Sequence, residues 1–206
     1  MNLQIDTTYK YNNSNFNQND LLELKKNLGF VPQNLYMVKS RSSDENKTPE
    51  ACLMYPLSKT SRNGKLEPFP TICWLTSKEL KVKVSFLESK GLVKEFRKRL
   101  LSNIQEYGLI MRKAHQLYAL ERQKMISEED NKIIIQKGWE KAFNKDIGIS
   151  GIIKKDIVIK TNDTFIKITS WDINVKCLHA HLAHYLVFPE HNNIIGKWTL
   201  DLLNLI

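Results

Sequence analysis

The sequence predicts a single α+β domain, and the order of its apolar patterns supports this fold class. Three strand-like apolar runs, at 34–40, 51–58 and 70–75, lie in the first half of the chain. Two long stretches with helical periodicity follow at 92–125 and 128–144. Strands gathered in one half and helices in the other are typical of α+β proteins, so we expect a small sheet packed by long helices.

Local capping signals predict the shorter helices. A helix is expected at 20–28, because Asn19 is a favourable cap and Gly29 a favourable end. The sequence Thr76–Glu79 matches a capping box, which predicts a second helix that runs to Lys90.

The C-terminal third combines a hairpin with one more helix. The runs 156–160 and 164–169 alternate apolar and polar residues around a polar turn, which predicts a β-hairpin. The pattern at 175–187 predicts the last strong helix, 189–196 is expected to be a loop, and an apolar tail begins at Trp198.

Composition indicates an intracellular globular protein. Of the 206 residues, 42% are hydrophobic and 26% are charged, which supplies enough apolar material for one core. No run of 18 apolar residues occurs, so we expect no membrane span. The segment 1–19 is Asn-rich and lacks a secretory pattern. We therefore predict a disordered lead-in there, one domain over 20–206 and a cytoplasmic location.

The cysteines exclude several common site classes. The chain has three, Cys52, Cys73 and Cys177, and no two of them form a C-x-x-C pair. An odd, small number of cysteines without a signal peptide indicates reduced thiols. Zinc ribbons and thioredoxin-like motifs are therefore not expected.

The positive charge is concentrated in one stretch. The net charge is +9, and residues 51–100 hold 11 Lys or Arg residues against 4 Asp or Glu residues. The run Lys94, Arg97, Lys98 and Arg99 falls in this stretch. It could attract an anionic partner such as nucleic acid, in which case the chain is a non-catalytic adaptor or a nucleic-acid-associated module. An ordinary solvated helix face is the alternative.

A cluster of cysteine and histidine predicts a metal site. Cys177, His181 and His184 are spaced i, i+4 and i+7, which places them within roughly 60° of one another on a helix. A thiolate with two imidazoles is a partial zinc site. The fourth ligand could be Cys52, Cys73, His115, a carboxylate or a water. Two other interpretations stay open, in which Cys177 is a nucleophile with a histidine base, or the helix is a core helix with hydrogen-bonded imidazoles.

A second polar cluster lies on the long helix. Arg112, His115, Tyr118 and Arg122 share one side of it, opposite the leucines of the expected core face. Such a stripe could hold a phosphate or carboxylate, and together with His179 it would complete a metal- or anion-binding pocket. A solvated face is again the alternative. No P-loop, GxGxxG, GxSxG or HExxH motif occurs, so the common nucleotide-binding and hydrolase classes receive no support.

Two motifs resemble a known family. The sequences 69–76 (FPTICWLT) and 175–184 (VKCLHAHLAH) are similar to motifs of the mainly bacterial, uncharacterised family called domain of unknown function five-zero-one. The Asn63-Gly64 turn is similar to a turn of that family. The family usually continues WLT with Cys-Pro, where this chain has Ser77-Lys78. The resemblance implies no activity, because none is assigned to the family.

Overall fold

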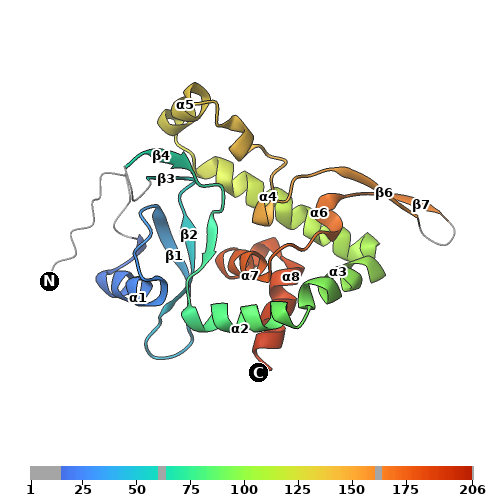
Figure 1. Cartoon of the computed structure of the whole chain (residues 1–206), viewed down its shortest axis with the longest axis horizontal. Coiled ribbons are helices and arrows are strands. Elements are labelled where there is room, and N and C mark those ends of the chain that lie inside the picture. Colours follow the sequence, from blue (N-terminus) through green and yellow to red (C-terminus); the bar gives the residue numbers. More distant parts are fainter. Residues whose placement is uncertain (1–14, 60–63, 161–163, 206) are drawn as a thin grey trace.

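The computed structural model describes residues 15–59, 64–160 and 164–205. In chain order, its helices and strands are α1 (Gln18–Leu28), β1 (Leu35–Arg41), β2 (Pro49–Met54), β3 (Leu57–Lys59), β4 (Leu66–Pro68), β5 (Cys73–Leu75), α2 (Lys78–Ser89), α3 (Leu92–Ser102), α4 (Leu109–Met125), α5 (Glu128–Gln136), β6 (Asp156–Lys160), β7 (Phe165–Thr169), α6 (Ser170–Ile173), α7 (Leu178–Val187) and α8 (Ile194–Leu203). Small antiparallel sheets pack against helices, which confirms the α+β class (Figure 1).

A three-stranded antiparallel sheet, in the order β1-β2-β5, separates two apolar layers. Successive strand residues point to opposite faces. Cys52 and Met54 of β2 therefore pack toward α1, whereas Ala51 and Leu53 pack into the main core with α7. Both faces of the sheet are covered, and β2 is apolar on both sides for this reason.

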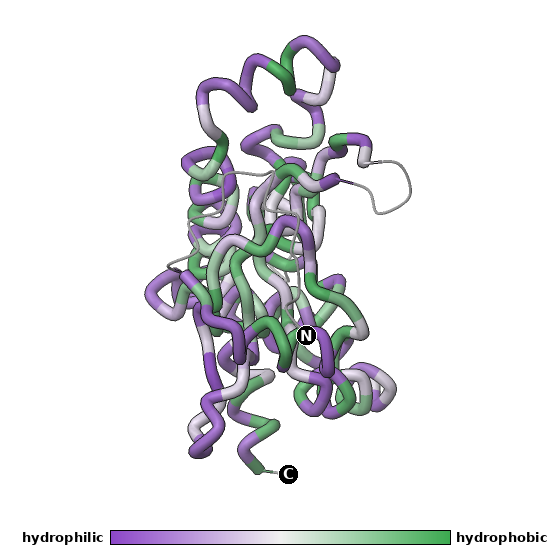
Figure 2. The backbone as a smooth tube through the Cα atoms, turned by 90° about the vertical axis from the view of Figure 1, so that its left-hand side faces the viewer, coloured by the Kyte–Doolittle hydropathy of each residue, from purple (hydrophilic) through white to green (hydrophobic). Residues whose placement is uncertain are grey.

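Helix α7 lies at the centre of the molecule and packs against β5, α2 and α8 (Figure 1). In Figure 2 the white and green segments of the backbone lie mostly toward the middle of the molecule, and many of the outlying turns are purple. Among the described helices, none combines the length and the apolar character needed to cross a membrane. The central position of α7 sets the surroundings of every cysteine and histidine in the 175–184 motif.

The helices expected at 92–125 and 128–144 are each shorter than predicted. The first is divided by a π-helical turn, Ile104–Gly108, where α6 packs so closely that a Cβ on Gly108 would lie 3.1 Å from the Cβ of Asp172. The second ends at Gln136, because Gly138 adopts a left-handed φ of 67°. The helical periodicity of the sequence predicted that these segments are helical, but it did not predict where each helix is interrupted or ends.

Three further predictions are corrected or refined. The loop expected at 189–196 contains the start of α8, whose cap is Asn193. Ser77 caps α2 in place of Thr76, because the Thr76 hydroxyl donates to the Pro49 carbonyl. The strand expected at 70–75 forms only at its end, as β5.

The hairpin predicted in the C-terminal third is confirmed as β6 and β7. The lead-in predicted at 1–19 lies outside the described residues over 1–14. Its last residues belong to helix α1, which begins at Gln18 and is capped by Asn17 and not by Asn19 as expected. The Asn63-Gly64 turn also falls partly outside the described residues.

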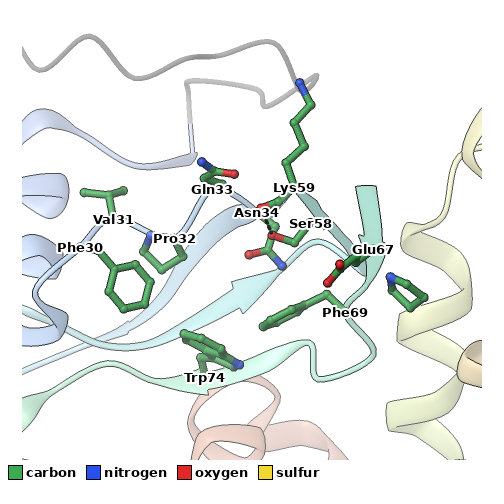
Figure 3. Close-up of a pocket in the computed structure, with 11 residues that line it drawn as sticks. Phe30, Val31, Pro32, Gln33, Asn34, Ser58, Lys59, Glu67, Phe69 and Trp74 are labelled. Atoms are coloured by element: carbon green, nitrogen blue, oxygen red, sulfur yellow. Dashed lines mark hydrogen bonds between the residues drawn. The ribbon is translucent and has the colours of Figure 1, made fainter. Parts of the chain in front are cut away.

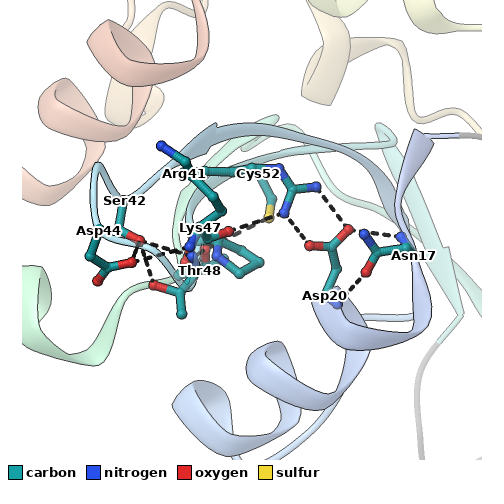
Figure 4. A network of polar contacts seen from close by, with 10 residues as sticks. Asn17, Asp20, Arg41, Ser42, Asp44, Lys47, Thr48 and Cys52 are labelled. Carbon is teal, nitrogen blue, oxygen red and sulfur yellow. Dashed lines mark hydrogen bonds and ion pairs between the residues drawn. The ribbon is translucent and has the colours of Figure 1, made fainter.

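An ion pair between Asp20 of α1 and Arg41 of β1 links α1 to the sheet (Figure 4). Asp20, whose side chain is 1% exposed, accepts from both terminal nitrogens of Arg41 on β1, with Nη2 at 2.8 Å from Oδ2. Asp20 also accepts from the Asn17 N–H at 2.8 Å and so completes the capping box of α1. Burial alone would raise the pKa of Asp20, but the Arg41 and Asn17 hydrogen bonds lower it overall. The stabilising contribution is therefore complete above the unfolded pKa and is lost as the pH falls through the folded pKa.

We predict that Arg41→Met lowers the free energy of unfolding by roughly 2–3 kcal/mol. Removing one partner of a buried pair typically costs about 3–5 kcal/mol, and the 34% exposure of the Arg41 side chain reduces this cost. Urea unfolding at pH 7 measures the change. Lys26→Met is the matched control, because the Lys26 side chain is 74% exposed in its pair with Glu23 and should change stability by less than about 0.5 kcal/mol. Equal losses in both variants would contradict the prediction.

Candidate functional site

Cys177 lies just outside helix α7, at the N-cap position. Its backbone is extended, with φ −154° and ψ 120°, and the first helical residue is Leu178. His179 follows in the first turn of the helix. The two side chains meet at this end of α7, with Cys177 Sγ at 3.8 Å from His179 Nδ1. The helix begins three residues later than predicted, and for this reason His179, and not His181 or His184, is the histidine beside Cys177.

One face of α2 fixes the His179 ring. His179 Nε2 lies 3.1 Å from the Lys81 carbonyl oxygen and 3.3 Å from Ser85 Oγ. Since a carbonyl oxygen only accepts, Nε2 carries the proton and Nδ1 faces Cys177. A histidine that donates its other N–H to a backbone carbonyl is held as metal-ligating histidines usually are.

Glu88, near the end of α2, completes a three-residue cluster. Its Oε1 accepts from the Leu178 N–H at 2.6 Å and lies 3.4 Å from His179 Nδ1. One ligand atom each from Glu88, Cys177 and His179 lies within 4.8 Å of the other two, and all three residues are half-buried. Sequence reasoning missed Glu88, because it lies 90 residues from its partner Leu178 and no local pattern links them.

The surroundings of His179 favour positive charge. The Cys177 thiol, the Lys81 carbonyl and the Glu88 carboxylate outweigh the effect of burial and raise the pKa of His179 to about 9. These groups therefore favour the protonated, positively charged form of the His179 imidazole over the neutral form.

The metal-ligand set predicted from helical spacing does not come together. Cys177 lies outside the helix, while His181 and His184 point inward and are fully buried. Asn193 binds both imidazoles, with Nδ2 at 3.0 Å from His184 Nδ1 and Oδ1 at 3.3 Å from His181 Nδ1. His184 Nε2 in turn lies 3.0 Å from His191 Nδ1. Among the described residues, these histidines form no metal-binding group with Cys177.

In the described part of the chain, none of the three residues predicted as fourth ligands joins the group of Glu88, Cys177 and His179, although the His115 ring packs edge-on against His181 with ring centres 5.9 Å apart. Cys52 is buried beneath α1 beside Thr76, and burial raises the pKa of its thiol to about 12. Cys73 is buried in the main core, where burial raises its pKa well above the usual value. His115 is fully buried, stacks on Trp171 and accepts from the Ile149 N–H. Neither cysteine is therefore a ready thiolate.

The polar stripe on α4 has the opposite orientation from the predicted one. His115, Tyr118 and Arg122 face the core and are at most 2% exposed, whereas Leu109 and Leu120 face solvent. Tyr118 accepts from the Ile72 N–H, and Arg122 donates to the carbonyls of residues 144 and 147. These contacts satisfy only part of the buried polar groups, because His115 Nε2 and Arg122 Nε and Nη1 have no hydrogen-bond partner among the described residues.

The remaining pocket residues are separated. Arg112 pairs with Asp172 on α6, so its guanidinium already has a carboxylate partner. His179 belongs to the cluster at the N-terminus of α7. The predicted pocket of His179, Arg112, His115, Tyr118 and Arg122 is therefore divided over three parts of the molecule.

The basic run on α3 is exposed, as a surface for anions requires. Two of its members make contacts within the chain: Lys98 pairs with Glu95, and the Arg99 guanidinium lies 4.0 Å from the centre of the Trp198 ring. The proposed binding of an anionic partner to Lys94, Arg97, Lys98 and Arg99 stays a prediction.

We predict that acid destabilises the protein through its buried histidines. Burial lowers the pKa of His181 to about 4 and holds that of His115 and His184 well below 6.5. These residues stabilise the fold above pH 6.5, and the contribution is lost as the pH falls toward 4, because the unfolded chain binds protons first. Between pH 6.5 and 5.0, protonation of His181 in the unfolded chain should lower the free energy of unfolding by roughly 1–2 kcal/mol. His181→Gln should show a correspondingly weaker pH dependence in urea unfolding. Identical dependences in the two proteins would contradict this account.

One of the comparisons with known proteins identifies a family. The family described as "Protein of unknown function (DUF501)" matches residues 40–201, which covers most of the chain and includes all three cluster residues. No curated protein and no solved structure matches the chain. The resemblance inferred from the FPTICWLT and VKCLHAHLAH motifs is thereby confirmed. The chain belongs to the DUF501 family of proteins of unknown function.

Proposed function

We propose that this chain is a zinc-binding protein whose metal is held by Glu88, Cys177 and His179. The fourth coordination position of the zinc would be free for water or substrate, as in a hydrolytic zinc centre, and would face an apolar groove that Cys177 and His179 line. The ligand set keeps Cys177 from the sequence-based prediction and replaces His181 and His184 by His179 and Glu88.

The spacing of the donor atoms carries the proposal. With tetrahedral angles and bonds of about 2.3 Å to sulfur and about 2.0 Å to nitrogen or oxygen, zinc separates sulfur from nitrogen by roughly 3.5 Å and nitrogen from oxygen by roughly 3.3 Å. Cys177 Sγ lies 3.8 Å from His179 Nδ1, and Glu88 Oε1 lies 3.4 Å from the same nitrogen. Small side-chain adjustments are enough to place one ion within reach of all three.

Charge and ligand chemistry support the same assignment. A thiolate and a carboxylate together balance the charge of a divalent ion, and the neutral imidazole completes the set. Sulfur combined with nitrogen and oxygen donors suits zinc better than magnesium or calcium, which prefer oxygen alone. The Lys81 carbonyl orients His179 through its N–H, which is the role of outer partners in zinc sites.

Three protein ligands leave one position for water or substrate. A bound zinc ion would lower the pKa of its water toward about 7 and supply a nucleophile for hydrolysis. The chain's own contribution is to hold the three donors, to keep the site half-buried, and to open it on one side to an apolar groove lined by Cys177 and His179.

We predict that untagged protein, exposed to zinc and desalted, retains close to one zinc ion per chain. Cys177→Ser, His179→Gln and Glu88→Gln should each weaken zinc binding more than about a hundredfold, since even outer partners contribute about 10–100-fold. Elemental analysis and competition with a chromogenic chelator measure the stoichiometry and the affinity.

Two matched controls separate this ligand set from its alternatives. His181→Gln alters a histidine of the same helix, and Glu79→Gln alters a carboxylate of α2 outside the cluster; both should keep wild-type zinc affinity. Thermal unfolding verifies that each variant is folded. Zinc loss in His181→Gln with retention in His179→Gln would favour the helical set, and a folded wild-type protein without measurable zinc affinity would overturn the proposal.

A further inference from the structure

The Cys177–His179 end of the cluster opens into an apolar groove. The cavity has a volume of about 400 Å³ and is lined by two of the three proposed ligands. The other lining residues come from the end of α1, from the chain around β5, and from α2 and α7; they are Leu28, Phe30, Thr71, Cys73, Trp74, Leu75, Lys81 and Ala180. A volume in this range is typical of small-molecule sites.

The groove offers a ligand mainly carbon surface. Its walls include Phe30, Trp74, Leu75 and Ala180, and the charged side chains among the lining residues are Lys81 and, at neutral pH, His179. Phe30 is 52% exposed although it is a large apolar side chain. A ligand part without hydrogen-bonding groups would cover this surface and remove it from water.

The apolar surface continues beyond the groove. Phe30 and Trp74 also line a second, larger pocket of about 760 Å³, where Phe69 lies beside Trp74 with ring centres 5.2 Å apart (Figure 3). Figure 3 shows Phe30, Trp74 and Phe69 along one side of that pocket and Lys59 and Glu67 near its far end. A hydrocarbon chain of a ligand that begins beside Cys177 would therefore find further apolar contacts beyond the first groove.

We propose that the groove binds the alkyl or acyl chain of a ligand whose carboxyl-type head group lies at Glu88, Cys177 and His179. The assignment of the head group rests on the proposed zinc site, because a carboxyl derivative is a natural zinc ligand. The assignment of the ligand's hydrocarbon chain to the groove rests on the shape and apolar lining of the groove alone. The ligand class is accordingly an acyl compound, such as an ester or amide of a medium-length fatty acid.

The first experiment tests whether the groove binds a hydrocarbon chain when no zinc is present. Alkyl methanethiosulfonates with chains from methyl to octyl react with Cys177, which forms a disulfide with the alkylthio group and releases methanesulfinate. In chelator-treated full-length protein, the reaction rate relative to glutathione should rise with chain length, because the groove holds the chain beside the thiol. The rise should reach roughly fourfold per methylene where the chain is fully buried. Mass spectrometry locates the modification, and Cys177→Ser gives the background.

Matched variants show whether the groove is responsible. Phe30→Ser removes an exposed groove wall and should flatten the chain-length dependence, whereas Phe86→Ser removes a phenylalanine of similar exposure, 53%, outside the groove and should leave it unchanged. A rate that is independent of chain length in the wild-type protein overturns the proposal, as does an equal effect of both variants.

The second experiment adds the metal. Titration of zinc-loaded protein with hydroxamates from acetyl to octanoyl should show affinity that rises with chain length and falls in Phe30→Ser with zinc content unchanged. Retained zinc with equal affinity for all chain lengths would overturn the acyl-chain assignment and leave the zinc site intact. Absence of zinc together with chain-dependent modification of Cys177 would overturn the zinc site and the carboxyl head group, and support the apolar-chain assignment.

Discussion

The side chain of Asn193 fixes the junction of α7 and α8, and the position of every candidate site residue on α7 depends on it. Its oxygen accepts from the Gly196 N–H at 3.2 Å and so begins α8, while its Nδ2 lies 3.0 Å from His184 Nδ1 and 3.2 Å from the His181 carbonyl. The helices meet so closely that a Cβ on Gly196 would lie 2.4 Å from that carbonyl. Glycine at 196 and asparagine at 193 thus determine the orientation of α7, and this orientation brings Cys177 and His179 to Glu88.

The histidines of the 175–184 motif serve two different chemistries because they have two different environments. His181 and His184 are enclosed by core side chains, which lower their pKa and keep them neutral. Burying a neutral imidazole costs little where both nitrogens have hydrogen-bond partners, which holds for His184, whereas His181 Nε2 has none among the described residues. His179, two residues before His181, is half-buried beside a thiol and a carboxylate, and its pKa is raised. The same residue type is a core component at two positions and a candidate ligand at the third.

A metal centre and an apolar groove favour each other physically. Apolar walls exclude water and lower the local dielectric, which strengthens the interaction of an ion with its thiolate and carboxylate ligands. Backbone groups orient two of the proposed ligands, the Lys81 carbonyl for His179 and the Leu178 N–H for Glu88. Backbone contacts of this kind hold the donors in place without adding further charge.

The sequence by itself determined the features that depend on neighbours a few residues apart. Helix α1, the β6–β7 hairpin and the helical character of 178–187 follow from capping residues, alternation and periodicity, and Cys177 was a site candidate from the sequence alone. Only the tertiary structure decided that Cys177 precedes the helix, that His115, Tyr118 and Arg122 face inward, and that Glu88 joins Cys177 and His179. These outcomes depend on which surfaces are buried against one another and on a contact across 90 residues of chain. Local patterns fix the conformation of a segment, whereas the partner of each side chain is fixed by packing between segments.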